Sequence, residues 1–220
     1  HEIKNPLTPI QLASDRLLKK YRPDDQKAAD QFEEYVRIIM RQVDDIGRMV
    51  DEFSAFARMP QPEMDRHSLL EIVNGQISLF ASKDLSLDVE IDDAKQDYTT
   101  ICDAGLVRQA LTNLLQNAKD SLQEHHVAAP AIRISMASED DMIAITLADN
   151  GAGFPEMDLG KLLEPYVTTR QKGTGLGLAI VSKIMEDHGG KMQLGKADSG
   201  GALICLKFPI HTTTHIGKVI

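Results

Sequence analysis

The sequence predicts two parts, an all-α helical hairpin followed by an α+β sandwich. Three observations support this prediction. Roughly the first 60 residues carry helical apolar spacing and no strand pattern. Pro60 and Pro62 then interrupt the chain, because proline removes a helix donor and disfavours helical geometry just before it. Beyond them, helical and strand patterns are mixed without the strict alternation of a parallel sheet.

Length and composition are those of an ordinary globular chain. The 220 residues are 42% hydrophobic, which is enough for a sizeable core. The net charge of -9 argues against a nucleic-acid partner, because a phosphate backbone requires a basic surface. No apolar run reaches the roughly 20 residues of a membrane helix, so we expect no membrane contact by this stretch. Cys102 and Cys205 are expected to be buried thiols of a cytoplasmic protein.

Residues 1–59 contain two helical patterns separated by Pro23 and two aspartates. In the second pattern, apolar residues recur at steps of four and three, which forms a heptad seam: Phe32, Val36, Ile39, Val43, Ile46, Val50, Phe53 and Ala57. The first pattern follows the same rule, with Ser14 as its weak position: Ile3, Leu7, Ile10, Leu17 and Tyr21. A lone hairpin leaves both stripes in water, so we expect two copies to form a four-helix bundle, that is, a homodimer. Packing of the hairpin on its own C-terminal domain is the alternative.

A linker is expected over 60–67 and a second domain over 68–210. In that domain, the apolar spacing predicts helices over 69–81, 104–122 and 175–187. Strands are expected over 85–91, 132–136 and 143–147, and around Met192 and Leu203. Residues 211–220 are polar and unpatterned, so we expect a flexible tail.

The segment Asp149-Asn-Gly151-Ala-Gly153 directly follows a predicted strand. Its glycines allow backbone to approach a ligand closely, and the Asp149 carboxylate can accept the exocyclic amine hydrogen of adenine. Taken alone, the segment is equally typical of a β-turn.

A second glycine-rich segment, Gly173-Thr-Gly175-Leu176-Gly177, opens a predicted helix. Backbone N–H groups and the positive dipole end at such a place can hold phosphate oxygens, and Lys172 just ahead can meet phosphate charge. The spacing excludes a dinucleotide fingerprint and a P-loop. An ordinary turn with a helix cap is the alternative.

Two further groups have residue types suited to phosphoryl transfer. Asn113 and Asn117 lie four apart on one helix face, where an amide carbonyl can bind Mg²⁺; ordinary polar surface residues are the alternative. At the start of the chain, the imidazole of His1 can accept a phosphoryl group if Glu2 takes its proton, although a lone histidine is more often inert. Asn5 stands where a zinc protease would have a second histidine.

Five segments resemble, in order, the H, N, G1, F and G2 boxes of the sensor histidine kinases of two-component systems. They lie at 1–8, 113–117, 149–153, 163–166 and 173–177, so the resemblance covers nearly the whole chain. It implies a dimerisation and histidine-phosphotransfer hairpin, followed by an ATP-binding domain of the gyrase, heat-shock-90, histidine kinase and mismatch-repair (GHKL) type. Stretches at 1–12, 41–53 and 162–170 further resemble the NtrY nitrogen-regulatory sensors.

The resemblance implies ATP-dependent autophosphorylation of His1, with Glu2 as proton acceptor. The phosphoryl group would then pass to an aspartate of a response regulator with an NtrX-like receiver domain. Asn5 occupies the position that in this family orients water for dephosphorylating the regulator. The fragment would be the cytoplasmic portion of an inner-membrane sensor.

For the nucleotide, the resemblance implies that Asn117 is the Mg²⁺ ligand, assisted by Asn113, and that Asp149 recognises adenine. The remaining implied binding residues approach the nucleotide or frame its phosphates beneath a lid over 154–174: Gly151, Gly153, Lys172, Gly173, Gly175, Leu176 and Gly177. The lid carries Leu163 where the family has its first aromatic residue. Two alternatives remain, a degenerate nucleotide-binding sensor and a GHKL-type ATPase without autokinase activity.

Overall fold

The computed structural model describes residues 4–21, 23, 25–57, 61–81, 86–91, 97–155, 158–168 and 174–210. The chain divides into two compact units, a helical hairpin and a larger unit built around a sheet. Within the described ranges, no helix combines the length and apolar character needed to cross a membrane.

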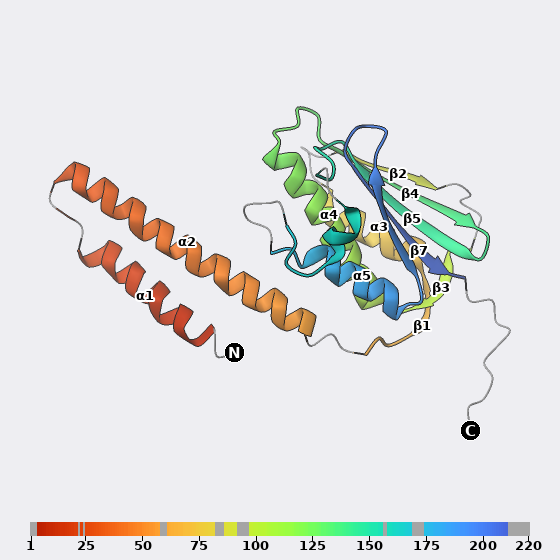
Figure 1. The fold of residues 1–220 in the computed structure, drawn as a ribbon, viewed down its shortest axis with the longest axis horizontal. Helices are drawn as coiled ribbons and strands as arrows, with labels where there is room; N and C mark the ends of the chain where they lie inside the picture. The colour runs from red at the N-terminus through yellow and green to blue at the C-terminus, as the bar shows by residue number, and fades with distance from the viewer. Residues whose placement is uncertain are drawn as a thin grey trace, which may run out of the picture. The chain divides into compact units, whose positions relative to one another are not determined.

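The hairpin consists of α1 (Lys4–Lys20) and α2 (Gln26–Ala57), as predicted (Figure 1). The Gln11 amide of α1 donates a hydrogen bond of 2.8 Å to the Asp44 carboxylate of α2. Between the helices, Ser14, Val36 and Val43 are buried. Ser14, the weak position of the predicted seam, therefore lies inside the contact between the helices.

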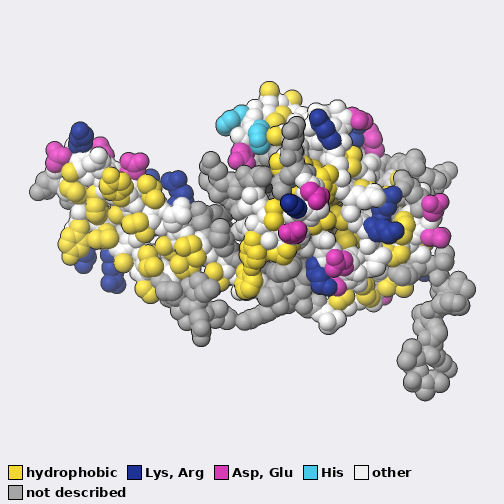
Figure 2. All heavy atoms as spheres, viewed as in Figure 1, with side chains coloured by type: hydrophobic (Ala, Val, Ile, Leu, Met, Phe, Trp, Pro, Cys, Tyr) yellow, Lys and Arg dark blue, Asp and Glu magenta, His cyan; other side chains and the backbone are white. Residues whose placement is uncertain are grey.

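The predicted apolar seam is only half covered within one hairpin. Val36 and Val43 are 3% and 7% exposed, whereas Ile39 and Ile46 of the same seam are 43% and 41% exposed. Further large apolar side chains of the hairpin are also exposed: Ile10, Leu12, Leu17, Tyr21, Tyr35, Ile38 and Phe53. Figure 2 shows apolar side chains gathered along these helices. The uncovered half of the seam is therefore an exposed apolar surface of the kind that marks an interaction site.

The larger unit is a two-layer α+β sandwich, which confirms the predicted fold class. A five-stranded sheet has the order β2 (Ser86–Ile91), β4 (Ala131–Glu139), β5 (Met142–Asp149), β7 (Ala202–Pro209), β6 (Lys191–Lys196). Only β2 runs parallel to its neighbour; the other pairs in this sheet are antiparallel. Three helices cover one face of the sheet (Figure 1): α3 (Leu69–Phe80), α4 (Ala104–Glu124) and α5 (Gly177–Asp187).

Alternating strand residues build the core beneath these helices. Those on the helix-covered face are all at most 7% exposed: Ile132, Ile134, Met136, Ile143, Ile145, Leu147, Ile204, Leu206 and Phe208. The opposing stripe of α4 is equally buried, with its members at helical spacing: Leu106, Val107, Ala110, Leu111, Leu114, Leu115, Ala118 and Leu122. Each such burial contributes about 1.5–3 kcal/mol. This packing fixes the orientation of α4 and therefore of its two asparagines.

Three short elements were not predicted. Strands β1 (Asp65–Ser68) and β3 (Thr99–Cys102) pair antiparallel in a separate two-stranded sheet, and a 3₁₀ helix, η1, spans Leu159–Leu163. Each strand has four residues, which is too few for an alternating pattern to stand out. Because β1 takes up 65–67, the expected linker over 60–67 ends in a strand of the larger unit.

Asp103 ties three segments of this unit together. Its Oδ1 accepts hydrogen bonds from the N–H groups of Gly105 and Leu106 at 2.8 and 3.0 Å, which caps α4. Its Oδ2 accepts the Glu63 N–H at 2.9 Å, just ahead of β1. Its own N–H donates to Nε2 of the buried His188, 2.9 Å away at the end of α5.

We expect Asp103→Ala to lower the free energy of unfolding by about 0.5–2 kcal/mol at neutral pH, because the helix cap is lost. Partial burial raises the pKa of Asp103, but the N–H groups of Leu106, Glu63 and Gly105, together with His188, lower it by more. The net result is a pKa below the usual value of an aspartate. A lowered folded pKa gives stability above the unfolded pKa of about 3.9, and that stability is lost as pH falls through the folded pKa. Urea unfolding at pH 7 and pH 3 should therefore show the difference from wild type shrinking in acid.

The matched control is Asp97→Ala, since Asp97 is 69% exposed and makes a surface ion pair with Arg66. Its free energy of unfolding should stay close to that of wild type at both pH values. A difference between Asp103→Ala and wild type that is the same at pH 7 and pH 3 would contradict the assigned role of the charge.

Both cysteines are free and buried, as predicted. Burial and the neighbouring Asp103 carboxylate raise the pKa of Cys102 to about 11, against the opposite effect of Arg108. The Cys102 thiol is therefore protonated at neutral pH and acts as a small core side chain.

Candidate functional site

The structure describes most of the predicted nucleotide-site residues: Asn113, Asn117, Asp149, Gly151, Gly153, Gly175, Leu176 and Gly177. His1, Glu2, Lys172 and Gly173 lie outside the described residues. For Asn5, only the backbone is described, in the first turn of α1. The geometry below therefore concerns the nucleotide side of the predicted site.

The Asp149 carboxylate is held in one orientation at the end of β5. It is 7% exposed and belongs to the helix-covered face of the sheet. Its Oδ1 accepts hydrogen bonds from the N–H groups of Gly151 at 2.8 Å and Ala202 at 3.2 Å. Among the described residues, no donor is bonded to Oδ2. An oriented carboxylate with one unengaged oxygen is suited to accept a hydrogen bond from an amine.

The loop after Asp149 leaves little room for side chains at its glycines. A Cβ at Gly151 would lie 3.0 Å from both Asp149 Oδ1 and Ser121 Oγ of α4. Gly153 has a φ of +75°, and a Cβ there would lie 3.1 Å from the carbonyl oxygen of Gly200. Since β5 pairs with β4 and β7, the segment does not form a hairpin with a strand directly after it. The segment is therefore not the loop of a β-hairpin.

The two asparagines of α4 lie one turn apart, and Asn117 reaches the start of α5. A Cβ added to Gly177, the first residue of α5, would lie 3.3 Å from Asn117 Nδ2. The Nδ2 of Asn113 is buried and has no hydrogen-bond partner within the described part of the chain. An unsatisfied buried donor costs about 1–3 kcal/mol, so an acceptor such as a phosphate oxygen would stabilise this group.

Gly175 differs from its predicted place in a helix. It lies before α5, which begins at Gly177, and its φ of +71° is left-handed. Its carbonyl oxygen accepts the Tyr166 N–H at 3.1 Å, which joins the predicted lid to the segment before α5. The N-cap of α5 is Leu176, whose apolar side chain cannot accept a hydrogen bond, and the first N–H groups of a helix favour an anion.

Comparison with known families identifies the family to which this chain belongs. The family model described as "Histidine kinase-, DNA gyrase B-, and HSP90-like ATPase" matches residues 102–212. The model described as "His Kinase A (phospho-acceptor) domain" matches residues 1–62. The chain belongs to the sensor histidine kinase family.

Relatives of this chain confirm the predicted subfamily. The nitrogen regulation protein NtrY of Azorhizobium caulinodans is 45% identical over 216 residues, which cover 94% of this chain and 27% of that protein. An NtrY-like sensor histidine kinase of Rickettsia bellii is 41% identical over 210 residues, which cover 94% of this chain and 34% of that protein. The chain thus spans about a third or less of the length of these curated relatives.

Solved structures show the same folds. The catalytic domain of histidine kinase ThkA is 29% identical, with a TM-score of 0.58 over 67% of this chain and 95% of that chain. Two longer structures match at the level of the fold. Histidine kinase ThkA in complex with response regulator protein TrrA has a TM-score of 0.69 at 24% identity, covering 96% of this chain and 59% of that chain. Full-length ShkA in complex with AMPPNP has a TM-score of 0.68 at 22% identity, covering 98% and 45%.

We expect Gly175→Ala to weaken nucleotide binding by about tenfold or more. An alanine pays about 1–2 kcal/mol for left-handed backbone, and its Cβ would lie 2.6 Å from the carbonyl carbon of Tyr166. The contact between the lid and the start of α5 must then open. Binding of a fluorescent ATP derivative measures the loss.

Gly189→Ala is the matched control for this prediction. The φ of Gly189 is +62°, but nothing lies within 4 Å of the added Cβ. This substitution therefore strains the backbone without creating a steric clash. It should lower stability and leave nucleotide affinity unchanged. Equal nucleotide affinities of Gly175→Ala and wild type would show that the Tyr166 contact does not shape the site.

Sequence reasoning missed the connection between β6 and β7, where Ser199, Gly201 and Ala202 contact Asp149. The signal available was the Ser-Gly-Gly stretch ahead of the last strand, which resembles any other tight turn. Its importance depends on pairing of β7 with β5, which the sequence does not display.

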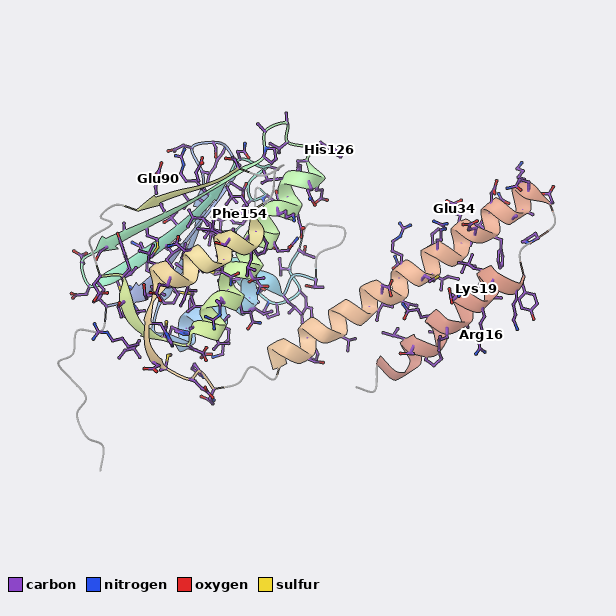
Figure 3. The ribbon with its side chains drawn as sticks, turned by 180° about the vertical axis from the view of Figure 1, so that it is seen from behind. Arg16, Lys19, Glu34, Glu90, His126 and Phe154 are labelled. Atoms are coloured by element: carbon purple, nitrogen blue, oxygen red, sulfur yellow. The ribbon has the colours of Figure 1, made fainter. Side chains whose placement is uncertain are left out.

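A hollow of about 320 Å³ also opens on the larger unit, lined in part by Glu90, Arg133, Thr146 and Asp198. Figure 3 shows Glu90 on the edge strand β2. The Arg133 guanidinium lies 3.7 Å from the Glu90 carboxylate, and both side chains are more than half exposed, at 60% and 64%. Asp149 borders the hollow, but neither asparagine of α4 and no residue of α5 lines it. The lining carries four carboxylates, of Asp88, Glu90, Asp149 and Asp198, and its Arg133 guanidinium is paired with Glu90, so the hollow is acidic and poorly suited to phosphate.

Proposed function

We propose that this chain is the catalytic region of a protein histidine kinase, which binds Mg-ATP in the unit over 68–210 and phosphorylates His1 in the hairpin over 1–59. The observation that carries the proposal is the Asp149 carboxylate, whose Oδ1 is held by two backbone N–H groups while Oδ2 bonds to no described residue. The match to an ATPase family model and the AMPPNP bound in ShkA support a nucleotide as its ligand.

In this proposal, Asp149 Oδ2 accepts the exocyclic amine of adenine, and Gly151 and Gly153 let the loop approach the nucleotide. The buried Nδ2 of Asn113 donates to a phosphate oxygen, which removes its unsatisfied state. Asn117 would hold Mg²⁺ through its amide oxygen, and the ion would neutralise phosphate charge when bound.

The phosphates lie against the segment that leads into α5, framed by Gly173, Gly175, Leu176 and Gly177, with Lys172 supplying a positive charge. The N-terminus of α5 supports this placement, because its N–H groups favour anions. The phosphate-facing groups in this proposal come from α4, from α5 and from the segment that leads into α5.

The chemistry balances without a further reactant. The unprotonated nitrogen of the His1 imidazole attacks the γ-phosphorus of ATP, and the bond from that phosphorus to the β–γ bridging oxygen breaks. ADP leaves with the electron pair. Glu2 takes the proton from the other imidazole nitrogen, which leaves a phosphohistidine whose ring is neutral.

The partner in autophosphorylation is a second copy of this chain, because the exposed half of the heptad seam needs an apolar surface to cover it. The partner in signalling is a response regulator with an NtrX-like receiver domain, whose aspartate takes the phosphoryl group and whose dephosphorylation uses Asn5. The complex of ThkA with its regulator supports this class of partner. The fragment would act in the cytoplasm as part of a membrane-anchored sensor.

Labelled ATP tests this function in a protein extended on the N-terminal side of His1. With Mg²⁺ and ATP labelled at the γ-phosphate, the protein should take up label that is lost in acid and stable in alkali, as a phosphoramidate is. Label at the α-phosphate should not be incorporated. Nucleotide hydrolysis without protein labelling would instead identify a GHKL-type ATPase, and binding without either reaction a degenerate sensor.

A further inference from the structure

The connection between β6 and β7 forms a closed turn. The Ala197 N–H donates to the Gly201 carbonyl oxygen, and the Gly200 N–H donates to the Ala197 carbonyl oxygen, each at 2.9 Å. Gly200 supplies the left-handed residue of this turn, with a φ of +95°. Ala197 is only 5% exposed, so one end of the turn is packed into the unit. The turn therefore has one preferred conformation.

This turn contacts Asp149 at three points. Ser199 Oγ donates to the Asp149 carbonyl oxygen at 2.8 Å, and the Ala202 N–H donates to Oδ1 at 3.2 Å. Between these contacts, Gly201 is so near that an added Cβ would collide with the carbonyl oxygen and with Oδ1 of Asp149. The turn thus contacts both the backbone and the carboxylate of the residue that faces the base.

The backbone conformation of Gly201 does not explain why this position lacks a side chain. The described glycines with left-handed φ are Gly153, Gly175, Gly189 and Gly200, and Gly201 is not among them. An alanine could adopt the Gly201 backbone without strain if the space were free. What excludes a side chain is the proximity of Asp149.

We infer that Gly201 is a positioning residue for the Asp149 carboxylate, and that through it the 197–202 turn sets the selectivity for a purine with an exocyclic amine. The inference rests on the proposed function. One carboxylate oxygen faces the base only while the other stays between the Gly151 and Ala202 N–H groups. A site built around such a hydrogen bond discriminates strongly against ligands that lack the matching donor.

Gly201→Ala tests the inference, because the new Cβ forces Asp149 to move. We expect the affinity for ATP to fall about tenfold or more, which is what loss of one hydrogen bond to a charged group produces. Purine riboside triphosphate carries no exocyclic amine and gains nothing from Asp149. Its affinity should therefore change little, and the ratio of the two affinities should collapse.

Three further variants make the result specific. Gly195→Ala on β6 is the matched control, since its Cβ would make an ordinary contact of 3.7 Å with Leu203 Cδ2. It should leave both affinities unchanged. Ser199→Ala removes only the hydrogen bond to the Asp149 carbonyl oxygen and should cause a smaller loss in the same direction. Ser199→Thr keeps the hydroxyl and should restore the wild-type ratio.

Isothermal titration with both nucleotides, alongside urea unfolding, distinguishes the outcomes. An equal loss of affinity for both nucleotides in Gly201→Ala would overturn the positioning role and leave a structural one. If Gly201→Ala does not fold, Ser199→Ala decides, and an unchanged ratio of affinities there overturns the inference. Wild-type protein that binds neither nucleotide would instead refute the proposed function itself.

Discussion

Replacing Asp149 with asparagine is expected to weaken ATP binding by about 100-fold or more while leaving the fold intact. An asparagine Oδ1 can still accept the Gly151 and Ala202 N–H groups that now bond to the aspartate Oδ1. The amide then presents Nδ2, a donor, where the wild type presents the Oδ2 acceptor. A donor facing the exocyclic amine of adenine is repulsive, so the loss exceeds that of one missing hydrogen bond.

The same geometry predicts a change of preference in Asp149→Asn. Inosine triphosphate carries a carbonyl oxygen where ATP has the amine, so the asparagine Nδ2 has an acceptor to bond. We expect the ratio of inosine triphosphate to ATP affinity to rise relative to wild type, measured by displacement of a fluorescent nucleotide. The control is Asp88→Asn, since Asp88 lies on the edge strand β2 and lines the acidic hollow, to which no residue of α4 or α5 contributes. Retained ATP affinity in Asp149→Asn would show that the base binds elsewhere.

His1→Gln is expected to reduce protein labelling from γ-labelled ATP to background, because glutamine keeps a polar side chain but has no nucleophilic nitrogen. ATP affinity should be unchanged, since the nucleotide groups lie on α4, β5 and α5. Matched controls are His67→Gln and His126→Gln; both residues lie outside the core, and Figure 3 shows His126 just beyond α4. Label that persists in His1→Gln would place the acceptor on another residue.

Mixing His1→Gln with Asp149→Asn protein extends this prediction. Neither variant alone should become labelled, since one lacks the acceptor and the other the nucleotide. If subunits exchange within a homodimer and transfer runs between subunits, the mixture should recover label on the Asp149→Asn chains. Transfer within a subunit leaves the mixture unlabelled, so the same measurement assigns the direction of transfer.

The predicted elements that the structure confirms are those with long periodic patterns. The hairpin, α3, α4 and the central strands all carry apolar residues at helical or strand spacing over two or more turns or pairs. The start of α5 was placed two residues too early, because Gly175 and Gly177 are equivalent in a glycine-rich sequence but differ in backbone conformation. Strands β1 and β3 were missed because their pairing joins residues far apart in the chain.

For the candidate site, sequence alone identified residues whose chemistry is local. Asp149, Asn113 and Asn117 are recognisable because their side chains and spacing match nucleotide chemistry without reference to a partner. Ser199 and Gly201 are not, because their importance comes from the approach of β7 to the end of β5. The hydrogen bond from Ser199 to Asp149 spans 50 residues.

Short stretches of sequence are enough to identify the order of the two parts, the family and the residues with reactive or ligand-binding groups, since periodicity and side-chain chemistry are local properties. The folded structure is needed to show, among the described residues, which Asp149 oxygen has no donor, which Asn113 donor is unsatisfied and which half of the heptad seam is uncovered. Those properties depend on distances between separate elements, and such distances are set by how the helices and strands pack.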